Sequence, residues 1–407
     1  MKAGENMVIG IIGGGASGMM AAIAAAKNKK AEIYIFERQA RVGKKLSATG
    51  NGRCNLTNCN PAPYGGEDPT FAQYALSRYS PGEMLGLFGQ LGLYTVIEES
   101  GRVYPYSDQA NSVVDVLRLA LDKENITVYC GCEVEQAVKA EDGFRLKTAQ
   151  GTYFCHKLIV ACGGIAGTKL GGTMSGYRLL GGFGHKTTRL RPSLVQLTSH
   201  HPALPSLKGV RANANVKIYR EDTLFAESTG EIQFTDKGLS GPVIFEISRD
   251  VCEGRGTWTA KLDLLPMLSN EKLVAMLTAR KNTNLTTDEL FTGILHNRLG
   301  RVITKEAGVG FCPISYLSEQ ELRNVAHYAK CFTAELTGTL GMDGAQVTAG
   351  GVYTKDFDPE TMESRRIPGL YACGEVLDID GPCGGYNLQW AWSSGFLAGE
   401  SAGRENV

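Results

Sequence analysis

Three glycines and one acid near the start of the chain have the types and spacing needed to bind a dinucleotide. Gly13, Gly15 and Gly18 directly follow the apolar run 7–12, and Glu37 ends the next apolar run. The glycines would allow a tight turn, a close backbone approach to a pyrophosphate and close helix packing. A carboxylate at Glu37 would accept hydrogen bonds from the adenosine ribose. We therefore expect a dinucleotide-binding loop here, with a helix N-terminus facing the phosphates.

Further segments favour FAD rather than NAD as this dinucleotide. They place glycines or charges where a flavin needs them: Arg38, 41–45, 50–55, 161–164, 371–375 and 384–388. The carboxylate of Glu375 would bind the ribityl chain, and 384–388 opens the last helix. The positive end of that helix would stabilise negative charge at the flavin N1–C2=O locus. No His or Cys placement singles out a covalent flavin link, so we expect non-covalent binding.

A parallel sheet is needed to position these residues. The pattern predicts a strand over 7–12, a helix over 16–27 and a strand over 32–36, which is a β-α-β unit. An antiparallel meander is then predicted, followed by another buried strand: 133–139, 144–148, 152–154 and 157–162. A meander inserted into a Rossmann sheet is the layout of FAD domains. The fold class is therefore α/β with a Rossmann-type FAD-binding domain.

The character of the sequence changes after about residue 193. Short strands are predicted first, and helices follow by periodicity: 213–219, 224–226, 232–234, 258–262, then 271–281, 288–299 and 319–330. We interpret this region as an inserted β-barrel-like lobe carrying a small helical subdomain. The chain then returns to the first domain with a strand at 368–373 and a helix at 388–399. The predicted order is FAD-binding domain 1–192, β-barrel-like domain 193–265, helical subdomain 266–330, return strand 331–345 and FAD-binding domain 346–407.

Composition narrows the classes of partner and compartment. Lys and Arg total 42, as do Asp and Glu, so no net charge favours nucleic acid or an anionic membrane. No apolar stretch is long enough to span a bilayer, and no signal-peptide pattern is present, so we expect a cytoplasmic protein with a small-molecule substrate.

The eleven cysteines are predicted to be free thiols. His200-His201 has no evident third ligand, so no metal site is predicted. Oligomeric state does not follow from the sequence.

Long motifs resemble one bacterial flavoprotein family over essentially the whole chain. The strings GGGASG, VGKKLSATGNGRCNLTN, FTDKGLSGP, VTAGGV and PGLYACGEVLDIDG are similar to the BaiN-type and aminoacetone-oxidase-type FAD enzymes. The resemblance implies a glutathione-reductase-like FAD domain interrupted by a β-barrel and a helical domain. It implies FAD contacts at Gly13, Gly15, Ala16, Ser17, Gly18, Glu37, Arg38, Lys44, Gly52, Arg53, Cys54, Asn55, Val134, Ala161, Gly163, Gly374, Glu375, Gly385, Tyr386, Asn387 and Leu388.

The same resemblance points to a substrate side. The matching segments contain Thr235, Ser240, Gly241, Thr348, Gly350 and Gly351. Loop geometry alone would explain these residue types equally well. A proton donor does not emerge clearly, and Tyr386, beside the expected ring edge, is the candidate.

The family resemblance implies an FAD-dependent oxidoreductase that transfers hydride through flavin N5. The leading hypothesis is a reductase that takes hydride from NAD(P)H and delivers it to a conjugated carbonyl compound, such as a bile-acid-like enone or dienone. Because the sequence has no second glycine loop with its own acid, NAD(P)H would dock only transiently. The alternatives are an aminoacetone-type amine oxidase that uses oxygen and a non-catalytic flavin-binding protein.

A disulfide reductase is a further alternative. Cys54 and Cys59 have the CxxxxC spacing of redox-active dithiols, which would pass electrons from flavin to a disulfide. The flanking glycines and helical context of that motif are missing, and so is a C-terminal His-x-x-x-x-Glu base. We therefore interpret these two cysteines as ordinary thiols.

Overall fold

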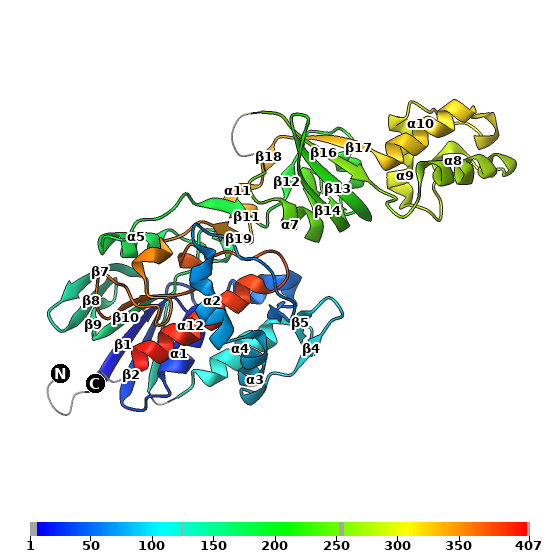
Figure 1. Cartoon of the computed structure of the whole chain (residues 1–407). Coiled ribbons are helices and arrows are strands. Elements are labelled where there is room, and N and C mark those ends of the chain that lie inside the picture. The colour runs from blue at the N-terminus through cyan, green and yellow to red at the C-terminus, as the bar shows by residue number, and fades with distance from the viewer. Residues whose placement is uncertain (1–5, 124, 252–255, 405–407) are drawn as a thin grey trace. The chain divides into compact units, whose positions relative to one another are not determined.

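The computed structural model describes residues 6–123, 125–251 and 256–404. The chain divides into two compact units. Unit 1 comprises Met1–Pro192 and Ala345–Val407, and unit 2 comprises Ser193–Gly344 (Figure 1). Each unit has its own cluster of buried apolar side chains, so each has its own hydrophobic core. Among the described residues, no helix is both long and apolar enough to cross a membrane.

A five-stranded parallel sheet forms the centre of unit 1. Its order is β20-β10-β1-β2-β6, and every neighbouring pair is parallel. The bounds are β1 Met7–Ile12, β2 Ala31–Glu37, β6 Ile126–Cys130, β10 Lys157–Val160 and β20 Leu370–Ala372. The predicted strands at both ends of the chain are therefore confirmed. Because all five strands run the same way, the segments that follow them meet at one edge of the sheet.

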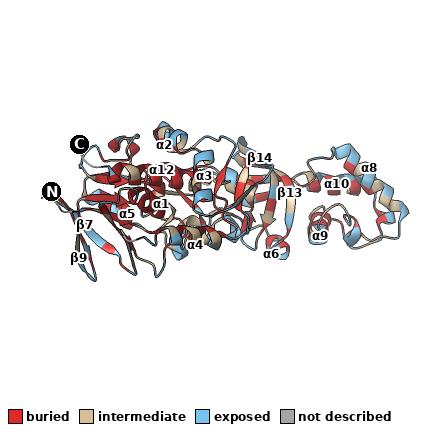
Figure 2. Cartoon of the chain, turned by 90° about the horizontal axis from the view of Figure 1, so that it is seen from below, coloured by how far each residue is buried: buried red, intermediate tan, exposed pale blue. Residues whose placement is uncertain are grey.

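Two helices pack together with backbone in contact. They are α1 (Ala16–Ala25) and α12 (Tyr386–Gly403), and both are largely buried (Figure 2). A side chain added at Gly395 would overlap the carbonyl of Ser17, and one added at Gly399 would overlap the carbonyl of Ala21. Glycine is therefore required along this face of α12. The close packing fixes where α12 begins relative to the loop that precedes α1.

Two small antiparallel sheets and the short strand β19 (Val347–Ala349) complete the strands that bear on the site in unit 1. The predicted meander is confirmed as β7 Val134–Ala140, β8 Gly143–Thr148 and β9 Gly151–Cys155. A second sheet has the order β3-β5-β4, with β3 Thr57–Asn58, β4 Thr95–Ile97 and β5 Arg102–Pro105. The remaining helices are α2 Ala72–Arg78, α3 Pro81–Gln90, α4 Ala110–Ala120 and α5 Ser175–Gly182.

Unit 2 contains a seven-stranded sheet of order β17-β16-β13-β14-β15-β12-β18, in which the described pairings are antiparallel. Its edge strands, β17 (Phe332–Leu336) and β18 (Gly338–Thr339), are separated in the chain by Thr337 alone. The sheet must therefore curl until its two edges approach, which is the predicted barrel-like form. The other bounds are β12 Leu197–Thr198, β13 Arg211–Arg220, β14 Thr223–Phe234, β15 Gly238–Ser240 and β16 Trp258–Asp263.

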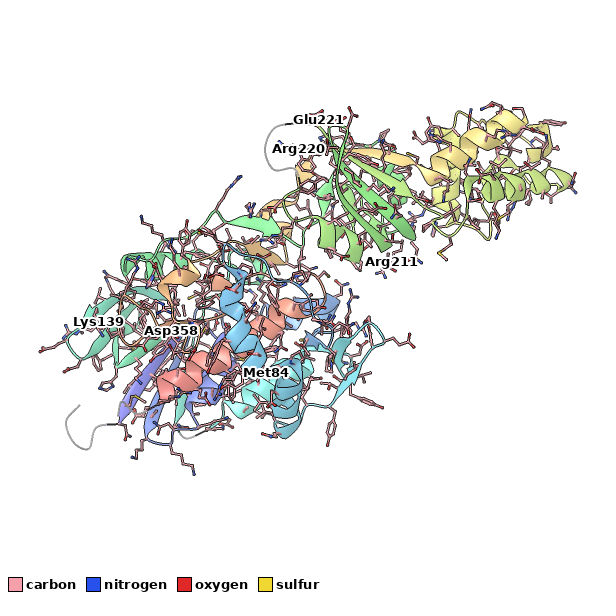
Figure 3. The ribbon with its side chains drawn as sticks, in the orientation of Figure 1. Met84, Lys139, Arg211, Arg220, Glu221 and Asp358 are labelled. Carbon is pink, nitrogen blue, oxygen red and sulfur yellow. The ribbon has the colours of Figure 1, made fainter. Side chains whose placement is uncertain are left out.

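One long hairpin differs from the prediction for this sheet. The expected strands 224–226 and 232–234 are a single strand, β14, because it pairs with β13 almost along its whole length. Arg211 and Arg220, labelled in Figure 3, are the two ends of β13. The polar stretch that suggested a break between the two strands is thus held extended by its partner.

The helical part of unit 2 confirms two predicted helices and corrects a third. α8 spans Asn270–Ala279 and α10 spans Glu319–Lys330. The helix expected over 288–299 is wrong: the chain makes a short 3₁₀ turn at Thr287–Glu289, and α9 begins only at Asn297 and ends at Glu306. Gly293 has φ +79°, which an α-helix does not accommodate. The other short helices are α6 Leu204–Leu207, α7 Pro242–Ile247 and α11 Gly341–Gly344.

Candidate functional site

The three glycines of the loop between β1 and α1 have different steric surroundings. Gly13 has φ +109°, and a side chain there would meet the carbonyl of Ala161. A side chain at Gly18 would overlap the carbonyl of Gly13, so helix and strand approach at backbone distance. A side chain at Gly15 would meet no atom within 4 Å. Gly15 therefore faces open space, and the loop leaves room there for a pyrophosphate to approach.

Glu37, at the end of β2, is buried and points its carboxylate at this loop. Its Oε2 accepts the N–H of Gly14 at 2.8 Å, and its Oε1 accepts the N–H of Gln39 at 2.7 Å. Each oxygen keeps a further lone pair, so the carboxylate can also accept hydrogen bonds from ribose hydroxyls. The N–H of Cys132 donates to the carbonyl of Glu37, which brings the start of the meander, at the buried Val134, close to the same end of β2.

A second carboxylate follows β20, the edge strand that pairs with β10. Glu375 Oε2 accepts Lys45 Nζ at 2.8 Å, and its Oε1 accepts the N–H of Thr348 at 2.8 Å. The carboxylate also faces Gly163, whose φ is +69°, and a side chain at Gly163 would meet only Glu375 Oε2, at 3.9 Å. Lys45 was not among the predicted contacts. Its signal in the sequence was its place in the basic run 41–45.

The basic residues predicted to contact FAD contact other protein groups in this structure. Lys44 Nζ donates to Gln39 Oε1 at 2.9 Å, and Arg38 Nη2 donates to the carbonyl of Gly171 at 3.1 Å. Arg53 pairs with Glu98 and Asp108, and its guanidinium lies 4.0 Å from the centre of the Tyr104 ring. In the following loop, a side chain at Gly52 would meet nothing within 4 Å, whereas Asn55 is buried and accepts the N–H of Val103.

The N-terminus of α12 is fixed by side chains of its own first turns. Gly385, with φ +102°, is the N-cap, and a side chain there would meet the backbone of Thr57. Trp390 Nε1 donates to the carbonyl of Gly374, and Ser394 Oγ accepts the N–H of Gly374. α12 is thereby tied to the loop after β20. Asn387 bonds with both backbone groups of Gly381, and Leu388 packs against the core of unit 1.

Tyr386 lies at this N-terminus, in a small cluster that the sequence did not reveal. The Asn58 side chain donates to the carbonyl of Gly384 at 3.1 Å. A Cβ built on Gly384 would be 3.5 Å from each of Arg102 Nε, Asn58 Nδ2 and Tyr386 Cε2. Burial raises the pKa of the Tyr386 phenol, and the positive charge of Arg102 partly offsets that rise. A neutral phenol beside a cation is suited to donating a proton.

These residues fit an FAD at the carboxyl edge of the parallel sheet. The glycine loop follows β1, Glu37 ends β2, Ala161 and Gly163 follow β10, and Glu375 follows β20. β2 and β10 flank β1 on opposite sides, so the edge contains the switch point where open α/β sheets bind their ligands. No protein atom lies close to the position that a side chain would take at Gly15, Gly52 or Gly163, which leaves room for a cofactor.

The residues predicted on the substrate side divide between the two units. Thr235, Ser240 and Gly241 belong to unit 2, and Thr348, Gly350 and Gly351 belong to unit 1. Several have local structural reasons for their identity. Thr235 Oγ1 donates to the carbonyl of Gly238, Gly241 has φ +104°, and a side chain at Gly350 would overlap the carbonyl of Arg189. Their role toward a substrate remains a prediction.

Cys54 and Cys59 are both free thiols in different environments. Cys54 is fully buried, and burial raises its pKa to about 12, whereas Cys59 is exposed. A buried, protonated thiol is unsuited to attack a disulfide substrate. The described cysteines are free, whereas Cys252 lies outside the described residues. The described part of the chain has no group of three metal-binding side chains, His200 and His201 included.

Comparison with known proteins shows the family of this chain. The profile described as "HI0933-like protein Rossmann domain" matches residues 7–401. A 3-dehydro-bile acid delta(4,6)-reductase of Clostridium scindens is 40% identical, over 97% of this chain and 98% of its own. A ribosomal RNA dihydrouridine synthase of Escherichia coli is 32% identical over 96% of each chain.

A solved structure shares the fold. The 3-ketosteroid delta1-dehydrogenase of Sterolibacterium denitrificans has a TM-score of 0.50 at 12% identity, with 97% of this chain and 99% of that chain covered. At this identity the likeness concerns the fold alone. The family, the fold and the relatives matched over nearly their whole length are those of an FAD-dependent oxidoreductase.

Proposed function

Because this chain belongs to the HI0933-like family of Rossmann-domain proteins, we propose that it is an NAD(P)H-dependent reductase of a C=C bond conjugated to a carbonyl group. The observation that carries this proposal is the 40% identity to a bile acid delta(4,6)-reductase, which extends over nearly the full length of both chains. The proposed substrate is a small hydrophobic enone or dienone of the 3-oxo bile acid type.

The second full-length relative supports the same chemistry on a different substrate. Dihydrouridine differs from uridine by two hydrogen atoms across a C=C bond that is conjugated to a carbonyl. A 32% identical relative named for that product therefore makes ribosomal RNA the second candidate substrate. The equal totals of 42 basic and 42 acidic residues favour the small molecule, because RNA-binding surfaces carry an excess of positive charge.

The residues of unit 1 have distinct tasks in this proposal. Bound FAD supplies the capacity to transfer hydride through its N5 atom. The loop at Gly13–Gly18 and the N-terminus of α1 hold the pyrophosphate, and Glu37 holds the adenosine ribose. Glu375, fixed by Lys45, holds the ribityl chain. Tyr386 holds the proton that the carbon next to the carbonyl must receive.

The nicotinamide nucleotide is proposed to dock transiently. The described strand pairings of unit 2 are antiparallel, so this unit offers no second Rossmann sheet that would hold NAD(P)H. Nucleotide and organic substrate would then use the site in turn, which predicts ping-pong kinetics. We place this reaction in the cytoplasm, where both reduced nucleotides are available.

Product analysis without oxygen tests the proposal. The FAD-loaded protein is incubated with NADH or NADPH and a steroidal 4,6-dien-3-one, and the organic product is identified by mass spectrometry. We expect a product heavier by two hydrogens, with one nucleotide oxidised per product. A parallel arm offers unmodified ribosomal RNA, and another offers aminoacetone with oxygen. Turnover confined to the RNA arm would select the second candidate, and turnover confined to aminoacetone would make the protein an amine oxidase.

A further inference from the structure

Arg102 has a position that the proposed FAD contacts leave unexplained. It is the first residue of β5, where it is paired with Asn58 of β3. Asn58 in turn holds the carbonyl of Gly384, immediately before α12. The Nε of Arg102 and the ring edge of Tyr386 are each 3.5 Å from a Cβ built on Gly384. The guanidinium and the phenol therefore lie around one glycine, together with the amide of Asn58.

The guanidinium of Arg102 is half-buried and has no fixed partner. Within the described residues it makes no hydrogen bond and no ion pair, although Arg53 nearby is paired with both Glu98 and Asp108. A half-buried cation without a counter-charge is unfavourable unless a ligand supplies one. The first amides of α12 are also positive and add no compensation. The positive charge of Arg102 and of the α12 N-terminus therefore favours binding of a ligand whose oxygen carries negative charge.

We propose that Arg102 binds the carbonyl oxygen of the substrate and stabilises the negative charge that this oxygen gains during reduction. This inference rests on the proposed function. When hydride, ultimately from the nicotinamide, reaches the carbon β to the carbonyl, the electron pair of the C=C bond moves toward the carbonyl. Arg102 donates hydrogen bonds to the resulting enolate oxygen. Tyr386 donates its hydroxyl proton to the α carbon and regains a proton from water, so two electrons and two protons are added in all.

Tyr386 is held so that it can act together with Arg102. The hydroxyl of Tyr64 donates to the backbone carbonyl of Tyr386 at 2.9 Å, and the two rings meet edge to face with centres 6.3 Å apart. These contacts fix the backbone and ring of Tyr386, and its hydroxyl makes no hydrogen bond to the described residues. Arg102 and Tyr386 would thus form an acid pair, with Arg102 on the oxygen and Tyr386 on the carbon.

The test uses a stable oxyanion in place of the substrate. Pentafluorophenolate is titrated into the oxidised, FAD-loaded protein, and binding is followed through the change in the flavin absorption spectrum. In Arg102→Met, the dissociation constant should rise about 10- to 100-fold, the range expected for a lost charge-assisted hydrogen bond. Arg102→Lys, which keeps the charge, should lose less. Arg118→Met, on the exposed face of α4, is the matched control and should bind as the unaltered protein does.

Three further measurements decide between explanations. The FAD dissociation constant and the rate of flavin reduction by NAD(P)H should stay within about 3-fold in Arg102→Met, while reoxidation by an enone slows. Equal loss of FAD affinity would mean that Arg102 serves the cofactor, and unchanged phenolate binding would mean that it binds no oxyanion. Either result overturns the inference. Failure of the unaltered protein to reduce any enone, with phenolate binding still dependent on Arg102, would contradict the proposed function and leave the oxyanion site in place.

Discussion

Lys45 Nζ lies 2.8 Å from Glu375 Oε2, although 330 residues separate the two in the chain. The pair joins the loop that follows β2 to the loop that follows β20, and each side chain is partly shielded from water. Glu375 is also held by the N–H of Thr348. The ion pair therefore fixes the orientation of a carboxylate that is predicted to bind the ribityl chain.

Removing either partner should weaken FAD binding. In Lys45→Met and in Glu375→Gln we expect the FAD dissociation constant to rise about 10-fold, because the carboxylate loses its orientation or its charge. Isothermal titration of the apoprotein measures this. Lys29→Met is the control, because Lys29 is exposed and is not among the predicted FAD contacts. Unchanged FAD affinity in both Lys45→Met and Glu375→Gln would mean that this pair does not govern the cofactor.

Replacement of Glu37 by Gln should also weaken FAD binding. The amide keeps the shape of the side chain but presents only one acceptor oxygen, whereas Glu37 now serves Gly14, Gln39 and the expected ribose. The expected loss is about 1.5–3 kcal/mol of binding free energy. Titration of the apoprotein with FAD and with riboflavin separates the causes. Riboflavin lacks the adenosine, so equal losses for both ligands would mean that Glu37 does not contact the ribose.

Gly399→Ala should destabilise the protein although alanine favours helices. The intrinsic preference would stabilise α12 by about 1 kcal/mol. The added methyl group would, however, overlap the carbonyl of Ala21, and the close packing of α1 and α12 would be lost. We expect unfolding free energy to fall by about 3 kcal/mol in urea titration. Gly86→Ala in α3, where the methyl group meets no atom within 4 Å, should instead be neutral or stabilising.

The thiol of Cys54 should remain unreactive in mild base. Because burial raises its pKa to about 12, it stays protonated at pH 9, and its side chain is inaccessible. Peptide mass spectrometry after iodoacetamide treatment should find Cys59, which is exposed, alkylated and Cys54 unmodified. Cys54→Ser/Cys59→Ser should keep turnover within a few-fold of normal. A long-wavelength charge-transfer band on reduction, lost in that double variant, would revive the disulfide-reductase hypothesis.

Much of the FAD-binding unit could be predicted because its signals are local. Gly13 and Gly18 each meet a backbone constraint and Gly15 faces open space, so the spacing of the three glycines indicates the turn. The meander follows from short alternating strands with turn residues between them. α10 was predicted with its bounds from its helical periodicity, and in the structure a capping box of Ser318 and Glu321 starts the helix at that point.

Other features depend on contacts between distant segments and left no local signal. Periodicity suggested a helix over 288–299, but the left-handed conformation of Gly293 ends the turn that Thr287 begins. The polar middle of β14 resembles a loop in the sequence, and only its pairing with β13 makes it part of a strand. Arg102 belongs to no motif, and only the pairing of β5 with β3 brings it to Gly384.

The central claim is that electrons flow from NAD(P)H through this site to a conjugated carbonyl compound. Stopped-flow absorbance in two halves tests it most directly. The FAD-loaded protein is first mixed with NADH or NADPH without oxygen, and the reduced protein is then mixed with a steroidal dienone or with air. The account predicts bleaching by a nucleotide, rapid recovery of the flavin spectrum with the dienone and slow recovery with air. Bleaching by aminoacetone but by neither nucleotide, with rapid recovery in air, would contradict it.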